Sequence, residues 1–341
     1  MILVNDPGSS AAYWPLKHAQ WNGWTPTDLI FPFFLFIVGV SLVLSFESRL
    51  KRGASRRALL AHALRRSATI FATGLLLNGL PHFHLATWRI PGVLQRIAVA
   101  YFAAALITLY SRTNARIVWI AALLVGYWAL MRFAPVPGYG IPSNDIPLLH
   151  PDANLAAYLD RKLMTGHLWE GTRDPEGVLS TLPAIATTLC GVLAGEWLLS
   201  GRSPKQKAAW MLVAGVTGLT AGELWGIWFP INKNLWTSSY VLFTAGFAMV
   251  CLALCYWTID IKLYPGWWTK PFVILGSNAI AAYVISEVLG GAFSWKDYIF
   301  QHIFARVSPP GLASLLYSLA IVGVCFVPVW WMYRNRIFLK A

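Results

Sequence analysis

Apolar runs of about 20 residues recur along the chain, with shorter polar stretches between them. A helix of about 20 apolar residues is long enough to cross the hydrocarbon core of a bilayer. The pattern therefore predicts an all-α fold, a polytopic membrane helix bundle, with nine full spans near residues 27–48, 58–80, 91–111, 114–134, 178–199, 207–229, 237–257, 271–289 and 311–333. The opening letters MILVN are typical of the last turn of an earlier helix. We therefore expect about ten transmembrane helices, the first of them truncated in this numbering.

The composition argues against a soluble protein. Of the 341 residues, 57% are hydrophobic and 12% are charged, and the mean hydropathy is +0.55. A soluble domain carries about 25% charged residues, so this chain has too little polar surface to face water on all sides. Many of the 18 tryptophans lie near the ends of the spans, which is typical of aromatic belts at the two membrane interfaces.

Positive charge alternates from one loop to the next. Fifteen Lys and Arg residues lie in the loops 49–57, 111–116, 200–207, 258–270 and 334–341. Eight lie in the other set, 6–26, 81–90, 135–177, 230–236 and 290–310. Because Lys and Arg collect in cytoplasmic loops, the first set is predicted to be cytoplasmic and the second extracytoplasmic. This largely explains the net charge of +13 without a nucleic-acid partner, and it predicts a multi-pass protein of the cell (inner) membrane, in contact with the lipid bilayer.

The chain is interpreted as one transmembrane domain over residues 1–341. Its longest loop, 135–177, is rich in proline at its start and contains one short predicted helix, 152–165, so we expect an extracytoplasmic lid there. The four cysteines fall inside apolar spans and indicate neither a disulfide framework nor a metal site: Cys190, Cys251, Cys255 and Cys325.

Ionisable residues gather on the predicted outer side. Within the outer parts of the spans they are Asp28, Arg96, Glu223 and Glu287. In the adjoining outer loops the polar residues are His18, Asn22, Asp174, Glu176, Asn232, Lys233 and Asn234. Charged groups inside a membrane are costly and usually face a cavity or a partner, so these residues predict one functional chamber. The alternative is that each pairs locally and holds the bundle together.

His18 is the most informative of these residues. It lies just before a predicted helix that Thr25 or Thr27 would cap and whose first turn would contain Asp28. A neutral imidazole acts as a general base or nucleophile near neutral pH, and a carboxylate beside it would orient it. The alternative interpretation is a structural histidine at the membrane interface.

The predicted inner face carries a different chemistry. Its dense basic patch comprises Arg49, Lys51, Arg52, Arg56, Arg57, Arg65 and Arg66, with His62 among them. Such a patch could hold the phosphates of a nucleotide cofactor. The alternative is ordinary positive-inside topology. The sequence contains no Walker motif, GxGxxG or HExxH, so Gly-rich nucleotide loops and zinc hydrolysis are not indicated.

Several motifs in these regions match a known family in order and over the whole chain. They are HAQWNG from His18, IPGVLQR ending at Arg96, DPEG from Asp174, PINKNLW ending at Trp236, GSNA from Gly276 and YRNRIF ending at Phe338. On these motifs the chain resembles the heparan-α-glucosaminide N-acetyltransferase family in its shorter bacterial form. PINKNLW and HAxWNG are long and unusual, which makes the resemblance specific.

The resemblance implies a multi-helix membrane enzyme that takes acetyl from cytosolic acetyl-CoA and transfers it to the amino group of a glucosamine on the other side. It implies His18 as the catalytic residue, and it aligns the asparagine of the family's V-N stretch, at the end of the first helix, with Asn5. In contrast to the lysosomal members, we expect no large luminal domain before the first helix. The stretch DPGSSAAYWPLK also differs from theirs, so the resemblance leaves the acceptor open.

These expectations combine into one mechanistic hypothesis. His18 acts as nucleophile or as general base, Asp28 orients it, and Asn5 or Asn22 donates to the oxyanion. The residues expected to bind the acetyl-CoA co-substrate are Arg96, Arg65, Arg66 and Arg57. Those expected to hold the amino sugar are Asp174, Glu176, Lys233, Asn234 and Glu223. No metal is expected to take part.

A transporter of amino sugars is the alternative function, because a similar chamber and topology would serve it. A homodimer is compatible with the resemblance, but no span carries a clear dimerisation signature.

Overall fold

The computed structural model of the chain describes residues 1–291 and 298–339. These residues form helices and loops and contain no β-strand beyond two isolated bridges, so the all-α prediction is confirmed for the described part of the chain. The long helices are α2 (Ile30–Lys51), α3 (Arg56–Gly79), α4 (Val93–Tyr110), α5 (Thr113–Phe133), α7 (Thr181–Leu199), α8 (Pro204–Gly226), α9 (Ser238–Cys255) and α13 (Pro310–Arg334). The shorter helices are α1 (Ile2–Asn5), α6 (Leu155–Leu163), α10 (Thr269–Ser277) and α11 (Ala279–Gly291). Single turns of other helix types are η1 (Trp14–Leu16), η2 (Pro26–Leu29), η3 (Tyr256–Ile261) and η4 (Phe300–Phe304).

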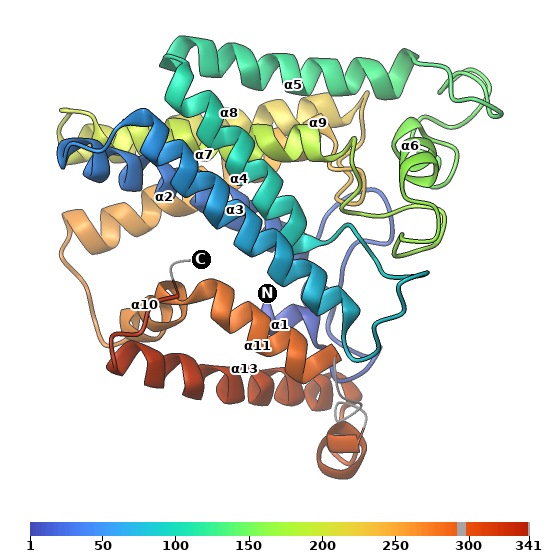
Figure 1. Cartoon of the computed structure of the whole chain (residues 1–341). Helices are drawn as coiled ribbons and strands as arrows, with labels where there is room; N and C mark the ends of the chain where they lie inside the picture. Colours follow the sequence, from blue (N-terminus) through green and yellow to red (C-terminus); the bar gives the residue numbers. More distant parts are fainter. Residues whose placement is uncertain (292–297, 340–341) are drawn as a thin grey trace.

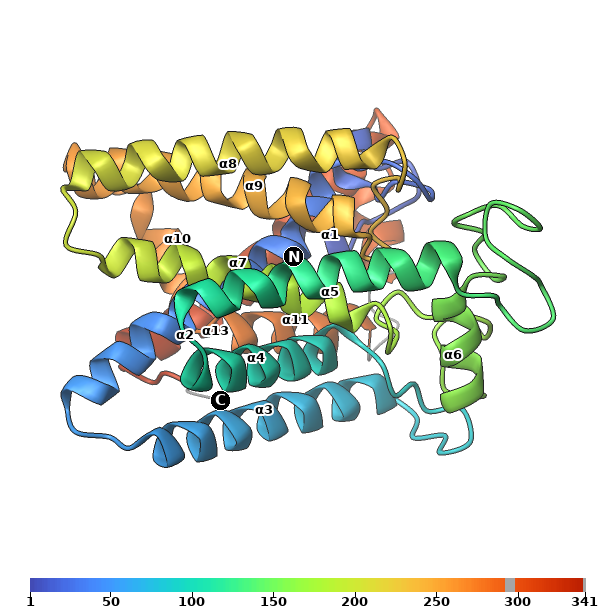
Figure 2. The ribbon, with the colours of Figure 1, turned by 90° about the horizontal axis from the view of Figure 1, so that it is seen from above.

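The helices run side by side, with α6 and the loops around it gathered at one end (Figure 1). Helices α10, α11 and α13 form a layer beside the others, and α1 packs against α11 and α13 on the side of this layer that faces the other helices. Figure 2 shows α3 and α4 along one edge of the molecule and α8 and α9 along the opposite edge. The end that carries α6 also carries the loops with few positive charges, so it corresponds to the predicted outer side.

The number of membrane spans differs from the prediction. In the described part of the chain, six helices are long and apolar enough to cross a membrane, or seven if the bent pair α10 and α11 counts as one span. The predicted spans 58–80 and 207–229 correspond to α3 and α8, which are long but more polar than their neighbours. The chain is therefore a multi-pass helical membrane protein, and the expected total of about ten spans is not confirmed.

The predicted span 271–289 is wrong as a single helix. It breaks at Asn278, and the two halves, α10 and α11, meet at 82°. The side chain of Asn278 bonds to the C-terminal segment. Its Nδ2 donates to the Ile337 carbonyl at 3.0 Å, and its Oδ1 accepts the Leu339 N–H at 2.9 Å. Asn278 therefore anchors the end of the chain at the break, a long-range contact that hydropathy does not reveal.

Helices α2 and α7 approach each other closely through two glycines. A Cβ on Gly39 would lie 2.0 Å from the Thr188 carbonyl oxygen, and a Cβ on Gly191 would lie 1.9 Å from the Phe36 carbonyl oxygen. Small residues allow membrane helices to pack backbone against backbone. This contact fixes α2, whose N-terminal end carries part of the candidate site.

Replacing Gly191 with alanine should therefore destabilise the bundle. The added methyl group meets backbone rather than a movable side chain, and overpacking of this kind costs about 1–3 kcal/mol. We expect a lower midpoint of thermal unfolding in detergent. The matched control is Gly126→Ala in α5, where a Cβ meets nothing within 4 Å. Equal stability of the two variants would contradict the close α2–α7 contact.

Candidate active site

His18 is held by the start of the following helix. Thr25 is the N-cap of η2, and the Asp28 Oδ2 atom accepts its backbone N–H at 3.0 Å. The same oxygen accepts the Ala19 N–H at 3.0 Å, which ties down the residue next to His18. The other carboxylate oxygen, Oδ1, lies 2.6 Å from His18 Nδ1. The buried Asp28 therefore orients an imidazole that stays 47% exposed.

Lys233 approaches the same imidazole from the PINKNLW loop. Its Nζ lies 2.9 Å from Nδ1 and 3.2 Å from Nε2 of His18, and 3.7 Å from Asp28 Oδ1. When Nδ1–H donates to Asp28, only the Nε2 lone pair is left to accept from Lys233. Burial lowers the pKa of Lys233 below its usual value, against the opposing attraction of Asp28.

His18 opens onto a cavity of about 800 Å³ at the outer end of the bundle. Its polar lining residues are Asn5, His18, Asn78, Thr87, Arg89, Tyr283 and Glu287. Asn5 Nδ2 donates to Glu287 Oε1 at 3.4 Å, so the end of α1 and the middle of α11 meet in this cavity. The structure thus brings Asn5 and His18 to one chamber, together with apolar walls that include Trp169.

Arg89 is a polar residue of this chamber that the sequence analysis missed. Its Nε and Nη2 donate to the two oxygens of Asp174 at 2.9 and 2.8 Å, and Nη2 also donates to Glu176 at 2.6 Å. The guanidinium lies 4.9 Å from the centre of the Trp169 ring. Burial lowers the pKa of Arg89, but the two carboxylates outweigh it, and the pKa is raised. The two acidic residues of the DPEG motif were the signal in the sequence that could have pointed to a cationic partner such as Arg89.

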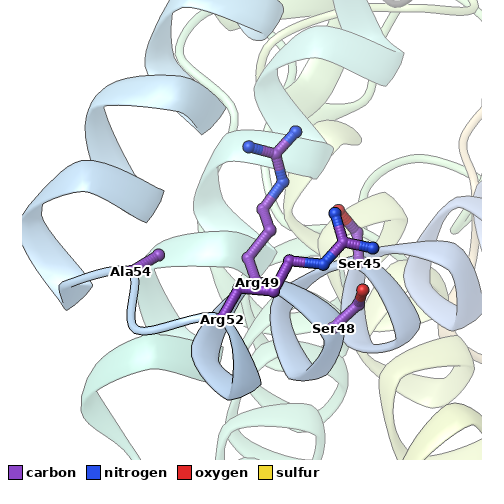
Figure 3. A pocket seen from close by; sticks show the side chains of 5 residues that line it. All are labelled: Ser45, Ser48, Arg49, Arg52 and Ala54. Atoms are coloured by element: carbon purple, nitrogen blue, oxygen red, sulfur yellow. The ribbon is translucent and has the colours of Figure 1, made fainter.

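A second cavity, of about 570 Å³, lies toward the predicted inner side. His62, Arg65 and Arg66 line it, and the Arg66 guanidinium lies 5.2 Å from the centre of the Tyr101 ring. A smaller pocket at the end of α2 adds further basic groups. Figure 3 shows Arg49 and Arg52 beside Ser45 and Ser48 in that pocket.

The sequence profile described as "Heparan-alpha-glucosaminide N-acetyltransferase, catalytic" matches residues 10–222. The chain belongs to this family. Heparan-alpha-glucosaminide N-acetyltransferase of Mus musculus is 34% identical to it over 93% of this chain, and that of Homo sapiens is 33% identical over 93%. The chain spans 57% and 56% of the length of these two relatives. The resemblance drawn from the motifs is confirmed.

In this member of the heparan-alpha-glucosaminide N-acetyltransferase family, Arg96 lies apart from the inner basic residues. It is buried near the outer end of α4, where Nη2 donates to the Gly177 carbonyl at 3.1 Å and to the Ser180 hydroxyl. Its guanidinium lies 5.0 Å from the centre of the Trp236 ring. The structure does not bring Arg96 together with Arg65.

Other predicted residues have structural partners. Asp174 is buried and accepts hydrogen bonds from Arg89, Trp169 and Glu176, and it does not line the outer cavity. Asn22 is exposed, and its side-chain oxygen accepts from Asn232 Nδ2 at 3.1 Å.

Three further predicted residues lie outside the two larger cavities. Asn234 lines a small outer pocket that also contains Asp160. Glu223 lies on an exposed part of α8, and Arg57 is exposed at the start of α3. Neither of the last two lines the outer or the inner cavity.

The HAQWNG and PINKNLW motifs of this family member pack against each other. The Gly23 N–H donates to the Ile231 carbonyl at 2.8 Å, in addition to the Asn22–Asn232 bond. The loop 135–177 reaches the same segment, because Trp21 Nε1 donates to the Leu149 carbonyl at 2.8 Å. Two sequence-distant motifs and the loop 135–177 therefore fix the segment that carries His18.

Asp160 on α6, within the loop 135–177, should make the stability of the fold depend on pH. Burial is the main cause that raises the pKa of Asp160 to about 6, although its carboxylate accepts the Val178 N–H at 2.9 Å. Because the folded pKa lies above the unfolded one, the folded state binds the proton more tightly. Asp160 should therefore favour folding below about pH 4 and oppose it increasingly as the pH rises through about 6. Asp160→Asn should raise the thermal midpoint more at pH 8 than at pH 5. An equal change at both pH values would contradict the raised pKa.

Proposed function

We propose that this protein is an integral membrane acetyltransferase of the cell (inner) membrane. It would move the acetyl group of cytosolic acetyl-CoA to the amino group of an extracytoplasmic amino sugar of the glucosamine type. Family membership supports the reaction class, because the two relatives are named as N-acetyltransferases of a glucosaminide. The site geometry supports the direction of transfer.

The observation that carries the proposal is the alignment of the two larger cavities along one pair of helices. Helix α3 lines the inner cavity with Thr73 and the outer cavity with Leu77. Helix α11 lines the inner cavity with Val284 and the outer cavity with Glu287. Four residues of helix span about 6 Å, so the cavities are about one helical turn apart on α3. We call this path the α3–α11 seam. It suits a long, flexible donor whose phosphates stay inside while its thioester reaches His18.

The chemistry at the outer end follows from the orientation of His18. Asp28 holds Nδ1, which leaves Nε2 to take a proton from the acceptor amine or to accept the acetyl group itself. Asn5 shares the chamber, and its amide is the candidate donor to the tetrahedral oxyanion. Arg89 and Glu287 line the same space and are suited to bind the hydroxyl groups of a sugar.

The decisive experiment is turnover of acetyl-CoA by the purified protein in detergent, with and without glucosamine, read as free CoA thiol. Glucosamine-stimulated release supports the proposal. A single release per protein without acceptor indicates an acetyl-enzyme and therefore a nucleophilic His18. Absence of release with any amino sugar, from folded protein, would contradict it. That result would favour the alternative function, a transporter of amino sugars. Transporters often contain discontinuous helices, and the bent pair α10 and α11 is one such helix here.

The inner cavity gives a prediction for the donor. Arg65→Gln should raise the KM for acetyl-CoA about tenfold, because a charge-assisted hydrogen bond to phosphate contributes about 1.5–3 kcal/mol. The rate at saturating donor should change little. Arg57→Gln is the matched control, since Arg57 is exposed on the same helix outside the cavity. Equal KM values for the two variants would place the donor phosphates elsewhere.

A further inference from the structure

A lysine amine lies against the imidazole at the centre of the candidate site. Lys233 Nζ is within 3.2 Å of both ring nitrogens of His18, and its side chain is only 19% exposed. The neighbouring Asn232 is fully buried, with its amide held between Asn22 Oδ1 and the Leu235 N–H. Lys233 is therefore held at His18 by an anchored loop and is not a freely moving surface lysine.

This position meets the requirement for an amine that reacts through His18. A general base must lie about 2.6–3.2 Å from the atom whose proton it removes. The Nε2 atom of His18 lies 3.2 Å from Lys233 Nζ, while Asp28 Oδ1 occupies Nδ1 at 2.6 Å. An acceptor amine would have to make the same contact with Nε2. Lys233 thus occupies the place that the acceptor amine needs.

Two opposing effects act on the protonation of Lys233. Asp28 and Glu176 favour the ammonium, and His18 is the titratable group in direct contact. Burial acts in the opposite direction and outweighs them, so the pKa of Lys233 is lowered. A larger fraction of the lysine is therefore the nucleophilic amine than at an exposed site.

We propose that Lys233 is an internal acetyl acceptor, modified at Nζ when the acyl-CoA thioester is present and the external amine is absent. The proposal rests on the proposed acetyltransferase function. The ammonium of Lys233 gives one proton through His18 Nε2 to solvent. The amine then attacks the thioester carbonyl carbon, the C–N bond forms and the C–S bond breaks. The CoA thiolate leaves with the second proton from nitrogen.

The product is an amide and is therefore stable, unlike an acetyl group on imidazole. Acetyl-Lys233 has lost its charge, and its acetyl group fills the space in front of Nε2. The modification would therefore silence the enzyme during a shortage of acceptor. An amino sugar bound at Nε2 would displace Lys233 and protect it.

The test uses the full chain, purified in detergent, and acetyl-CoA carrying an isotopically labelled acetyl group. The protein is incubated without acceptor at about pH 7 and about pH 9, treated with hydroxylamine to remove acyl-imidazole, and mapped by peptide mass spectrometry. Label should appear on Lys233 at least about tenfold faster than on Lys17, because a held amine reacts at a high effective concentration. Lys17 is the matched control, exposed and adjacent in sequence to His18. The rate should rise by up to about tenfold per pH unit below the lysine pKa.

Two variants and one parallel assay separate the outcomes. Lys233→Arg should show no hydroxylamine-stable label at this position, and His18→Ala should lose most of the label on Lys233. Formation of labelled N-acetylglucosamine with no label on Lys233 would overturn the inference and leave the proposed function standing. Equal labelling of Lys233 and Lys17 would overturn it as well, since it indicates simple reaction with the donor in solution. Absence of both labelled products would overturn the proposed function, and the inference with it.

Discussion

His18→Ala is expected to lower kcat/KM for acetyl transfer to glucosamine by at least about a hundredfold. General base catalysis contributes about 10²–10⁴, and the loss is larger if His18 carries the acetyl group as nucleophile. The physical reason is the contact of 2.6 Å between Nδ1 and Asp28, which leaves the Nε2 lone pair, 3.2 Å from Lys233 Nζ, to accept a proton or the acetyl group. The measurement is steady-state release of CoA thiol by the purified variant.

The comparison of His18→Ala with the original protein requires that the variant folds and still binds acetyl-CoA. His18 is 47% exposed, so its loss removes little buried packing, and thermal stability and acetyl-CoA binding should both be retained. The matched control is His84→Ala, which removes an exposed histidine from an outer loop and should leave turnover unchanged. Turnover close to the original level in His18→Ala would end its assignment as the catalytic residue.

Arg89→Gln is expected to destabilise the outer end of the bundle strongly. It leaves the buried carboxylates of Asp174 and Glu176 without their cation, and breaking a buried pair costs about 3–5 kcal/mol. The side chain of Arg89 is 20% exposed, so we expect a loss near the lower end, about 3 kcal/mol. The readout is thermal unfolding in detergent.

Two comparisons make this prediction specific. Arg306→Gln removes an exposed arginine from another outer loop and should change the midpoint little. The double variant Arg89→Gln with Glu176→Gln should recover part of the lost stability, because one of the unpaired charges is gone. If Arg89→Gln unfolds at the same temperature as the Arg306 control, the ion pair does not stabilise the fold.

Much of the fold follows from local sequence. Long apolar runs predict long helices, and Ser203 and Thr25 begin helices in the way that capping residues do. The proximity of His18 and Asp28 is also local, since the capped turn at Thr25 returns the chain toward His18. The catalytic role of His18 stays a prediction.

The features that sequence reasoning missed depend on contacts between distant segments. The break at Asn278 depends on the tail at Ile337, 59 residues away. Arg89 finds its partner at Asp174, 85 residues away, and Lys233 reaches His18 across 215 residues. Hydropathy and spacing describe single helices, so they do not show which loops meet at one end of a bundle. The motifs pointed to polar residues of the chamber, but they did not show which of these residues form hydrogen bonds or ion pairs with one another.

The anchor at Asn278 also bears on how the protein is handled in the laboratory. It holds the end of the chain so that Phe338 and Leu339 form part of the wall of the inner cavity. An affinity tag fused after Ala341 would therefore start close in sequence to this wall, which also holds the basic groups proposed to bind the donor phosphates. Tagged preparations should be compared with protease-trimmed ones before any weak affinity for acetyl-CoA is attributed to the enzyme itself.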